Sequence, residues 1–201
     1  KELAKELGTG LCVVVLGENI EEISKEVSRY GVQKIYSMDS PVLKDRRAEA
    51  FVPCLVDLAQ KYKPSILLFG ATTFGRDIAS GVATELRTGL TADCTGLEID
   101  PETKLLRQTR PAFGGNTMAT IVCEKHRPQM ATVRPKVFPK PEPQIPKDIY
   151  FFYHEDAPIS EEKVRTKILE VISAKEGVNL SDAEIIVSGG RGLGEAKNFK
   201  L

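Results

Sequence analysis

The residues best suited to bind a charged ligand lie near the end of the sequence, in the stretch VSGGRGLG at residues 187–194. Glycine lets a backbone approach a phosphate closely, and a helix behind it offers free N–H groups and the positive end of its dipole. Arg191 adds a permanent planar cation that can pair with a phosphate or lie against a flat ring. The run from Gly190, G-R-G-L-G-E, brings its third glycine one residue early for G-x-G-x-x-G, and no G-K-[ST] follows. Spacing alone therefore fits a phosphate-binding loop and a simple glycine turn equally well.

A second candidate for nucleotide binding is the loop Gly70–Asp77, within the stretch LLFGATTFGRDIASGVATEL. An apolar strand pattern ends at this loop and a helical pattern follows it. Ligands of parallel sheets bind at the carboxyl ends of the strands, so a nucleotide phosphate could bind here. The alternative, which we favour, is a structural turn in which Thr72 or Thr73 caps the helix and Arg76 and Asp77 lie on the surface.

The residue types give little support for metal binding or for acid–base catalysis. Neither a Ser/His/Asp set, a Cys/His set nor a pair of neighbouring carboxylates stands out, and His126 and His154 have no partner at metal-ligand spacing. We therefore expect neither a metal site nor acid–base catalysis. The four cysteines lie outside C-x-x-C pairs, which predicts reduced structural thiols in a cytoplasmic protein.

Charge and hydropathy narrow the range of partners. Lys and Arg total 28, and Asp and Glu also total 28, so no basic excess favours nucleic acid or an acidic membrane surface. No apolar run approaches the roughly 20 residues of a membrane-spanning helix. Charged residues also open the sequence where a signal peptide would be apolar. We expect no nucleic-acid binding and no membrane insertion.

Helical and strand patterns alternate over the first half of the sequence. The runs GLCVVVLG and SILLFG are continuously apolar, which is typical of strands buried on both faces. The alternation predicts an α/β fold with a parallel, doubly wound, nucleotide-binding-like sheet and right-handed crossovers. Because the first pattern is a helix, we expect a strand ahead of it in the complete protein. The predicted helices are 1–8, 19–31, 45–64 and 74–89, and the predicted strands are 10–17, 33–39 and 65–70.

Strand and turn patterns replace this alternation after Thr91, which predicts an antiparallel appendage on the parallel sheet. DPETK at residues 100–104 is a predicted turn, and Gly114-Gly115-Asn116 is a predicted hairpin turn. The runs TMATIVCE and QMATVRP alternate like half-exposed strands. Five prolines between Pro135 and Pro146 predict an extended segment on the surface.

The last quarter of the sequence predicts the end of one domain and the start of another. A strand is predicted at residues 148–156 and a helix at 160–177, with Ser160 as its N-cap. A new strand, the glycine turn and a helix are then predicted. We divide the chain into a first domain, residues 1–180, and the opening strand and loop of a second α/β domain, residues 181–201.

Several stretches resemble one family. IIVSGGRGLGEAKNFKL closely resembles the opening of the flavin domain in the α subunit of electron transfer flavoproteins. GATTFGRDIASGVATELRTGLTADCTGLEID is similar to the nucleotide-fold stretch of that subunit's first domain, and TRPAFGGNTMATIV and RPQMATVRP are similar to its bacterial, anaerobe-type members. The resemblance covers essentially the whole chain. The family's later arginine, glutamine-threonine-glycine and histidine motifs are absent, so we expect a chain truncated before most of its FAD domain.

This resemblance implies an αβ heterodimer that carries electrons on FAD and performs no acid–base catalysis of its own. Arg191 matches the arginine that lies at the FAD in the family, and Gly190 and Gly192 flank it. A cation beside a flavin stabilises the anionic reduced form and raises its potential. The implied redox partners are an acyl-CoA dehydrogenase, a membrane quinone oxidoreductase or, in anaerobe-type members, NADH with electron bifurcation. The loop alone is expected to hold FAD poorly, because ligand sites enclose most of their ligand.

Two other functions stay open at the level of sequence. An adenine-nucleotide-binding module of the stress-protein type would use the Gly70–Asp77 loop and would bind AMP or ATP without flavin. A pure heterodimer scaffold would use the first domain only to grip the β subunit.

Overall fold

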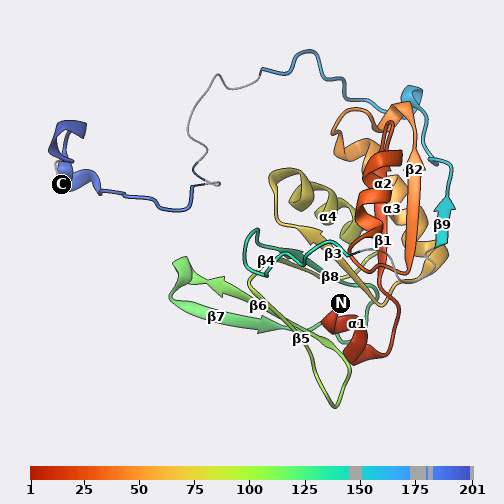
Figure 1. Cartoon of the computed structure of the whole chain (residues 1–201), viewed down its shortest axis with the longest axis horizontal. Helices are drawn as coiled ribbons and strands as arrows, with labels where there is room; N and C mark the ends of the chain where they lie inside the picture. The colour runs from red at the N-terminus through yellow and green to blue at the C-terminus, as the bar shows by residue number, and fades with distance from the viewer. Residues whose placement is uncertain (145–150, 173–179, 181–182, 200–201) are drawn as a thin grey trace. The chain divides into compact units, whose positions relative to one another are not determined.

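The computed structural model describes the chain except for residues 145–150, 173–179, 181–182 and 200–201. The chain divides into two units, Lys1–Lys167 and Ile168–Leu201. Every α-helix and β-strand found in the described residues lies in the first unit (Figure 1). The predicted domain boundary at residue 180 stays a prediction.

One parallel sheet has the strand order β1-β2-β9 (Figure 1). Its central strand is the most deeply buried, with Ile35 and Met38 fully enclosed. The register pairs Ile35 with Val13 of β1 on one side and with Phe152 of β9 on the other. Of the last predicted strand, residues 148–150 lie outside the described part of the chain. The strands are β1 (Cys12–Gly17), β2 (Lys34–Asp39) and β9 (Phe151–His154).

A second parallel sheet has the order β3-β8-β4. Its central strand β8 corrects one prediction, because QMATVRP was expected to be half-exposed and part of the antiparallel appendage. Gln129 and Thr132 are buried here, since their side chains accept hydrogen bonds from backbone N–H groups of Leu106 and Asp93, both at 2.8 Å. The strands are β3 (Ile66–Gly70), β4 (Leu90–Cys94) and β8 (Gln129–Val133).

The two apolar strands predicted to be buried on both faces are less buried than expected. Only Val15 of β1 is buried, and Leu68 of β3 is 41% exposed. Each strand lies at one end of its own sheet and pairs with one neighbour among the described residues. That part of the prediction is therefore wrong for the chain as it stands, because a strand buried on both faces lies inside a sheet.

The four helices predicted in the first half of the sequence are all present. α1 ends at Gly8, which takes the left-handed conformation with φ +64° that glycine adopts readily. α3 accommodates Pro53 within its length, and it packs beside α4, where the rings of Phe51 and Phe74 meet edge to face at 5.1 Å between centroids. Cys54 of α3 and Val82 of α4 are fully buried in the main core. The helices are α1 (Glu2–Leu7), α2 (Glu21–Ser28), α3 (Ala48–Tyr62) and α4 (Thr73–Glu85).

The antiparallel appendage forms a sheet of the order β5-β6-β7. Its first turn is held by Asp100, whose Oδ1 accepts from the N–H groups of Glu102 and Thr103, at 3.1 and 2.9 Å. Its second turn uses Gly114 and Gly115, at φ +70° and +94°, so both predicted turns are confirmed. The strands are β5 (Gly96–Ile99), β6 (Leu106–Ala112) and β7 (Thr117–Ile121).

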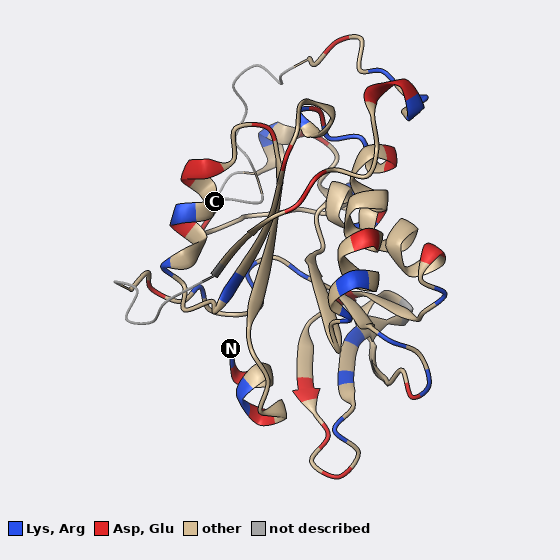
Figure 2. Cartoon of the chain, turned by 90° about the vertical axis from the view of Figure 1, so that its right-hand side faces the viewer, with Lys and Arg blue, Asp and Glu red and all other residues tan. Residues whose placement is uncertain are grey.

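Acidic and basic residues are interspersed, mainly on helices and loops (Figure 2). The proline-rich segment is irregular and largely exposed over residues 135–144, as predicted, and Pro146 lies outside the described residues. Within the described chain, no helix combines the length and the apolar character needed to cross a membrane.

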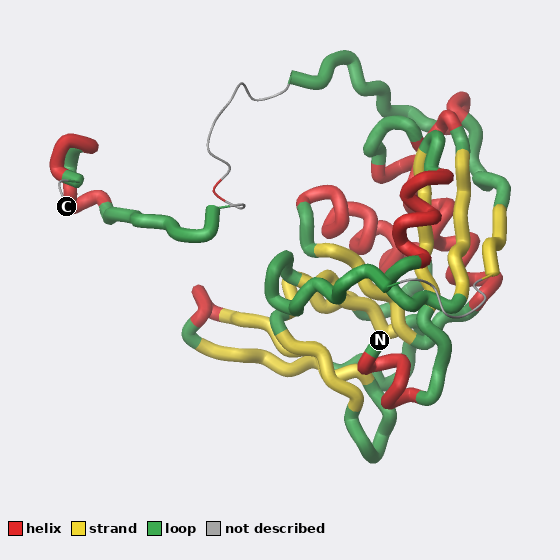
Figure 3. Tube along the Cα trace, in the orientation of Figure 1, coloured by secondary structure: helices red, strands yellow, loops and turns green. Residues whose placement is uncertain are grey.

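Regular structure is missing where the sequence predicted the last helix. Glu161–Lys163 forms one 3₁₀ turn, and the side chain of Ser160 does not cap it. Residues 164–172 are irregular (Figure 3), and residues 173–177 lie outside the described part. Leu169 is 95% exposed. A short amphipathic helix owes most of its stability to the packing of its apolar face. Here nothing covers that face among the described residues, so the helical pattern of the sequence does not form a helix.

The second unit shows the same discrepancy. The strand predicted before the glycine turn is irregular over residues 183–190, and Ile185 is 85% exposed (Figure 3). The helix predicted behind the turn is replaced by the 3₁₀ turn Ala196–Asn198. A strand needs a paired neighbour, and none contacts this run within the described residues.

Candidate functional site

The glycine–arginine loop forms a tight turn in the second unit. The N–H of Leu193 donates to the carbonyl of Gly190, and the N–H of Gly194 donates to the carbonyl of Arg191, both at 3.1 Å. The side-chain amide of Asn198 donates to the carbonyl of Leu193 at 2.6 Å and ties the turn to the residues behind it. The three predicted site residues therefore lie together in one defined turn.

The four glycines of this turn differ in backbone conformation and in the atoms that surround them. Gly194 has φ +73°, a conformation that other residues rarely adopt. A β-carbon on Gly189 would lie 2.0 Å from Cδ1 of Leu193 and 2.6 Å from Cζ of Phe199, so these two flexible side chains would have to shift. By contrast, a β-carbon on Gly190 or Gly192 would meet no atom within 4 Å. Neither packing nor backbone conformation demands glycine at these two positions, and open space lies over both.

The turn also presents groups that suit an anion. In the part of the chain that the structure describes, the N–H groups of Arg191 and Gly192 have no acceptor. The side chain of Arg191 is exposed, and no carboxylate of the described residues pairs with it. Successive free N–H groups form a concave anion-binding surface, and a guanidinium adds a planar cation. The geometry therefore fits a phosphate or a flat, negatively charged ring.

The Gly70–Asp77 loop has a different character. The hydroxyl of Thr72 accepts from the N–H of Gly75 at 3.0 Å, which confirms the predicted cap of α4. A β-carbon on Gly75 would overlap the carbonyl oxygen of Gly70 and lie 3.0 Å from Thr72 Oγ1. Protein atoms therefore fill the space that this glycine leaves. This observation favours the structural turn over a nucleotide site.

Arg134 lies at the carboxyl end of β8 beside Asp93 of β4, in a cluster of arginines that we did not predict from the sequence. The guanidinium of Arg134 donates to both carboxylate oxygens of Asp93, at 3.1 and 2.6 Å. These bonds hold the pKa of Asp93 below its usual value, and the charges of Arg76 and Arg110 lower it further. The residues come from four separate segments, so their spacing in the sequence carries no signal. The carboxylate of Asp93 already pairs with the guanidinium of Arg134, so this arginine is not free to bind an anionic ligand.

One serine–histidine contact was also not predicted from the sequence. The hydroxyl of Ser37 lies 2.9 Å from Nδ1 of His154, across the paired strands β2 and β9. Ser37 is only 2% exposed, so a substrate has no access to its hydroxyl. The contact joins two strands and does not form a catalytic pair.

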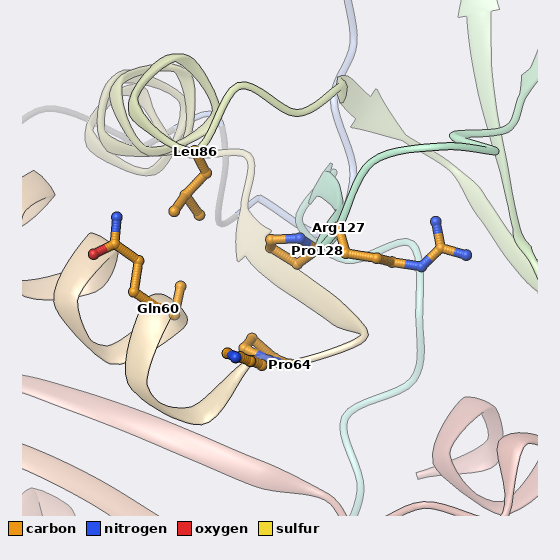
Figure 4. A pocket seen from close by; sticks show the side chains of 7 residues that line it. Gln60, Pro64, Leu86, Arg127 and Pro128 are labelled. Carbon is orange, nitrogen blue, oxygen red and sulfur yellow. The ribbon is translucent and has the colours of Figure 1, made fainter.

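A pocket of about 370 Å³ lies beside the C-terminal end of α3, lined by Gln60, Pro64, Leu86 and Pro128 (Figure 4). The side chain of Arg127 extends away from it, and one of its nitrogens donates to three backbone carbonyls of its own turn. None of the predicted site residues lies in this pocket.

Comparison with known proteins agrees with the resemblance noted in the sequence. The family described as "Electron transfer flavoprotein domain" matches residues 1–165. An electron transfer flavoprotein subunit alpha from Thermoanaerobacterium thermosaccharolyticum is 47% identical over the whole chain, which covers 61% of that relative. The subunit alpha from Clostridium acetobutylicum is 42% identical, with 100% of this chain and 60% of the relative covered.

A relative with another name matches equally well. Subunit LctC of a lactate dehydrogenase (NAD(+),ferredoxin) from Acetobacterium woodii is 44% identical over the whole chain, which covers 48% of that protein. The chain thus spans about three-fifths, or less, of the length of these relatives. The family match covers most of the 201 residues, and the identities lie well above the level at which family membership is in question. The chain therefore belongs to the α-subunit family of electron transfer flavoproteins.

Proposed function

We propose that this chain contains the opening of a flavin site and that Arg191, Gly190 and Gly192 contact FAD in the intact protein. The supporting observation is the glycine–arginine turn, with two N–H groups that have no acceptor among the described residues, an exposed guanidinium and open space over two glycines. FAD, when bound, supplies one- and two-electron transfer chemistry. The intact protein would serve as the α subunit of an electron carrier.

The 201 residues alone should bind FAD poorly or not at all. The turn supplies only a few contacts, whereas a ligand site encloses most of its ligand. The curated relatives extend well beyond the matched region, so we place the other FAD contacts in sequence outside these residues. We also keep the boundary between the first domain and the FAD domain at residue 180.

Arg191 is the residue whose role can be tested most directly. A guanidinium beside the flavin stabilises negative charge on the reduced ring, so Arg191→Ala in the intact protein should lower the flavin potential and weaken FAD retention. Arg191→Lys keeps the positive charge without the planar guanidinium. Its flavin potential and FAD retention should therefore lie between those of the unaltered protein and those of Arg191→Ala. Spectroelectrochemical titration gives the potential, and absorbance after gel filtration gives the FAD content.

Arg76→Ala is the matched control, because Arg76 lies at the Asp93 cluster in the first unit. It should leave both the flavin potential and the FAD content unchanged. If Arg191→Ala matched the unaltered protein in both measurements, the proposed site would be wrong. If Arg76→Ala released FAD, the site would have to be moved to the first unit.

We further propose that the first unit docks an electron transfer flavoprotein β subunit. Met118 and Ile121 on β7, with Val122 beside them, are 55%, 43% and 41% exposed. Exposed apolar side chains on a hairpin favour a protein interface. Capture of the β subunit by residues 1–180 would support this docking, and failure to bind would contradict it.

The redox partners are proposed by class. Acyl-CoA dehydrogenase or NADH would donate the electrons, and a redox acceptor such as a quinone oxidoreductase would receive them. The relative whose printed name contains NAD(+) and ferredoxin favours the NADH-linked version and keeps bifurcation in the proposal. We place the protein in the cytoplasm, because its four cysteines are free thiols.

The adenine-nucleotide module is the weaker alternative. It needs space at the Gly70–Asp77 loop, and the carbonyl of Gly70 already fills the position beside Gly75. Titration of the 201-residue chain with AMP and ATP separates the two proposals, since tight binding without flavin would favour this alternative.

A further inference from the structure

Three tyrosine rings contact one another in the main core of the first unit. Tyr36 and Tyr153 come from the neighbouring strands β2 and β9, whose register places them opposite each other, and Tyr62 is the last residue of α3. The ring centroids are 4.1 Å apart for Tyr36 and Tyr62, 5.1 Å for Tyr36 and Tyr153, and 6.1 Å for Tyr62 and Tyr153. Aromatic side chains in contact have separations of this size, so the three rings form one continuous cluster.

One of the three hydroxyl groups has a carboxylate beside it. The hydroxyl of Tyr62 donates to Oε1 of Glu155. The other carboxylate oxygen of Glu155 accepts from Nζ of Lys61 at 2.5 Å, and the Glu155 side chain is only 16% exposed. Within the described part of the chain, the hydroxyls of Tyr36 and Tyr153 have no such partner. Tyr62 is therefore the member of the cluster that has a proton acceptor in place.

The charges around Glu155 keep its carboxylate ionised. Hydrogen bonds from Lys61 and Tyr62 hold the pKa of Glu155 below its usual value. The bond to Glu155 also raises the pKa of the Tyr62 phenol. At neutral pH the pair is therefore a neutral phenol and an anionic carboxylate, which is the arrangement needed for a proton to move from the first to the second.

A phenol that donates to a carboxylate can lose one electron without building up positive charge. The electron leaves the Tyr62 ring, the O–H bond breaks, and the proton passes to Oε1 of Glu155. An oxidised phenol is a very strong acid, so a carboxylate of low pKa still accepts this proton. Nζ of Lys61 lies 5.4 Å from the centroid of the Tyr62 ring. Its charge opposes a positively charged ring and therefore favours loss of the proton together with the electron.

Sulfur atoms that are sensitive to oxidation lie in the same core. Met38 and Cys54 are fully buried, and the three tyrosines pack within the same hydrophobic cluster. Oxidation of a buried methionine makes its side chain polar and disrupts the packing around it. Because rings in contact exchange electrons, an electron lost from Tyr36 or Tyr153 is replaced from Tyr62, where proton transfer stabilises the product.

We propose that this tyrosine cluster gives up electrons to one-electron oxidants, such as peroxyl radicals, and so spares the buried sulfur atoms. The radical forms at Tyr62. Each event reduces the oxidant by one electron, leaves a neutral phenoxyl radical at Tyr62 and moves the hydroxyl proton to Glu155. A thiolate that returns one electron, together with the proton from Glu155, restores the phenol and becomes a thiyl radical. This activity does not rest on the flavin site.

A photogenerated ruthenium(III) polypyridyl complex serves as the oxidant in the test. It is produced by a light flash in the presence of the 201-residue chain and a cobalt(III) electron acceptor. Electron paramagnetic resonance of samples frozen after the flash should show a tyrosyl radical, and Tyr62→Phe should lose most of this signal. Phenylalanine keeps the ring and its packing, so the loss reports on the hydroxyl.

Glu155→Gln tests the proton acceptor. Glutamine keeps an oxygen that can accept the hydrogen bond, but it does not take the proton. Formation of the Tyr62 radical should therefore become at least about tenfold slower, because proton transfer to a positioned base is lost. The unaltered chain should react more slowly in D₂O than in H₂O, and this isotope effect should decrease in Glu155→Gln. A merely structural role of Glu155 would not change the isotope effect.

Tyr30→Phe is the matched control. Nζ of Lys140 lies 5.8 Å from the centroid of the Tyr30 ring, and no carboxylate of the described residues accepts from its hydroxyl. The yield and rate of radical formation should not change in this variant. After equal exposure to the oxidant, mass spectrometry should find more Met38 sulfoxide in Tyr62→Phe than in Tyr30→Phe or the unaltered chain.

Three results would overturn the proposal. The first is an equal radical signal in Tyr62→Phe and Tyr30→Phe, since the radical would then form elsewhere. The second is an unchanged rate and isotope effect in Glu155→Gln, since water would then take the proton. The third is equal oxidation of Met38 in Tyr62→Phe and the unaltered chain, since the cluster would then be a packing feature that protects no sulfur atom.

Discussion

Replacing Gly75 by alanine should destabilise the first unit, although alanine is the better helix former. The added β-carbon would overlap the carbonyl oxygen of Gly70, and it would lie 3.2 Å from the carbonyl carbon and 3.0 Å from Thr72 Oγ1. A backbone carbonyl cannot rotate away as a flexible side chain can. The end of β3 and the start of α4 must therefore move apart.

The size of the effect follows from three contributions. Overpacking of a close contact costs about 1–3 kcal/mol, and loss of the Thr72 cap would add about 1 kcal/mol. The higher helix propensity of alanine returns up to about 1 kcal/mol. We therefore expect a net loss of about 1–4 kcal/mol in the free energy of unfolding. For a chain of this size, each kcal/mol lowers Tm by about 2–4 °C.

Urea denaturation followed by circular dichroism measures this loss. Thr72→Ala separates the contribution of the cap, and it should account for about 1 kcal/mol. Gly190→Ala is the matched glycine control, because open space surrounds that position and its φ of −79° suits alanine. Its free energy of unfolding should change by less than about 0.5 kcal/mol.

The comparison of the two glycines also separates structure from ligand binding. In the intact protein, Gly190→Ala should weaken FAD binding without loss of stability, because the β-carbon would fill the space left for the ligand. Gly75→Ala should show the reverse. A stable Gly75→Ala variant would refute the packing argument, and equal instability of both variants would refute the distinction between the two kinds of glycine.

Other predictions test the core, the charges and the thiols. Met130→Ala should lower the free energy of unfolding by about 2–5 kcal/mol, because Met130 is fully buried in the central strand β8, and exposed Met118→Ala should change it by less than about 0.5 kcal/mol in the same urea titration. The pKa of Asp93 is lowered in the folded state, so its ion pair with Arg134 stabilises the fold above about pH 4, and this stabilisation is lost as the pH falls. Asp93→Asn should therefore make the free energy of unfolding depend less steeply on pH in the acid range. An unchanged slope would refute the reasoning. Burial raises the pKa of the Cys54 thiol to about 11, so a thiol reagent at pH 8 should label exposed Cys12 first and Cys54 only on unfolding; early modification of Cys54, detected by mass spectrometry, would contradict its burial.

Features that depend on local chemistry were predictable from the sequence. Gly8 ends α1 because it can take a positive φ, and Asp100 forms its turn through bonds to backbone groups two and three residues ahead. Thr72 caps α4 for the same kind of reason. Each of these features depends on residues within a few positions of one another, so tertiary contacts do not easily override the local sequence pattern.

Features that depend on distant partners were not predictable. The alternating run of β8 suggests a half-exposed strand, yet Gln129 and Thr132 are buried, because backbone N–H groups of other strands satisfy them. The cluster around Asp93 unites residues as far apart as Arg76 and Arg134. Only the fold brings these charges together, and spacing along the chain cannot show it.

The failure at β1 and β3 is of another kind, because the sequence pattern there predicts more burial than the two strands have. A continuous apolar run is stable as a strand when neighbours cover both of its edges and both of its faces. The two runs meet this condition on one edge each, and no described strand pairs with their other edges. The burial of a strand therefore depends on what covers its second edge, and an apolar run along the chain cannot show this.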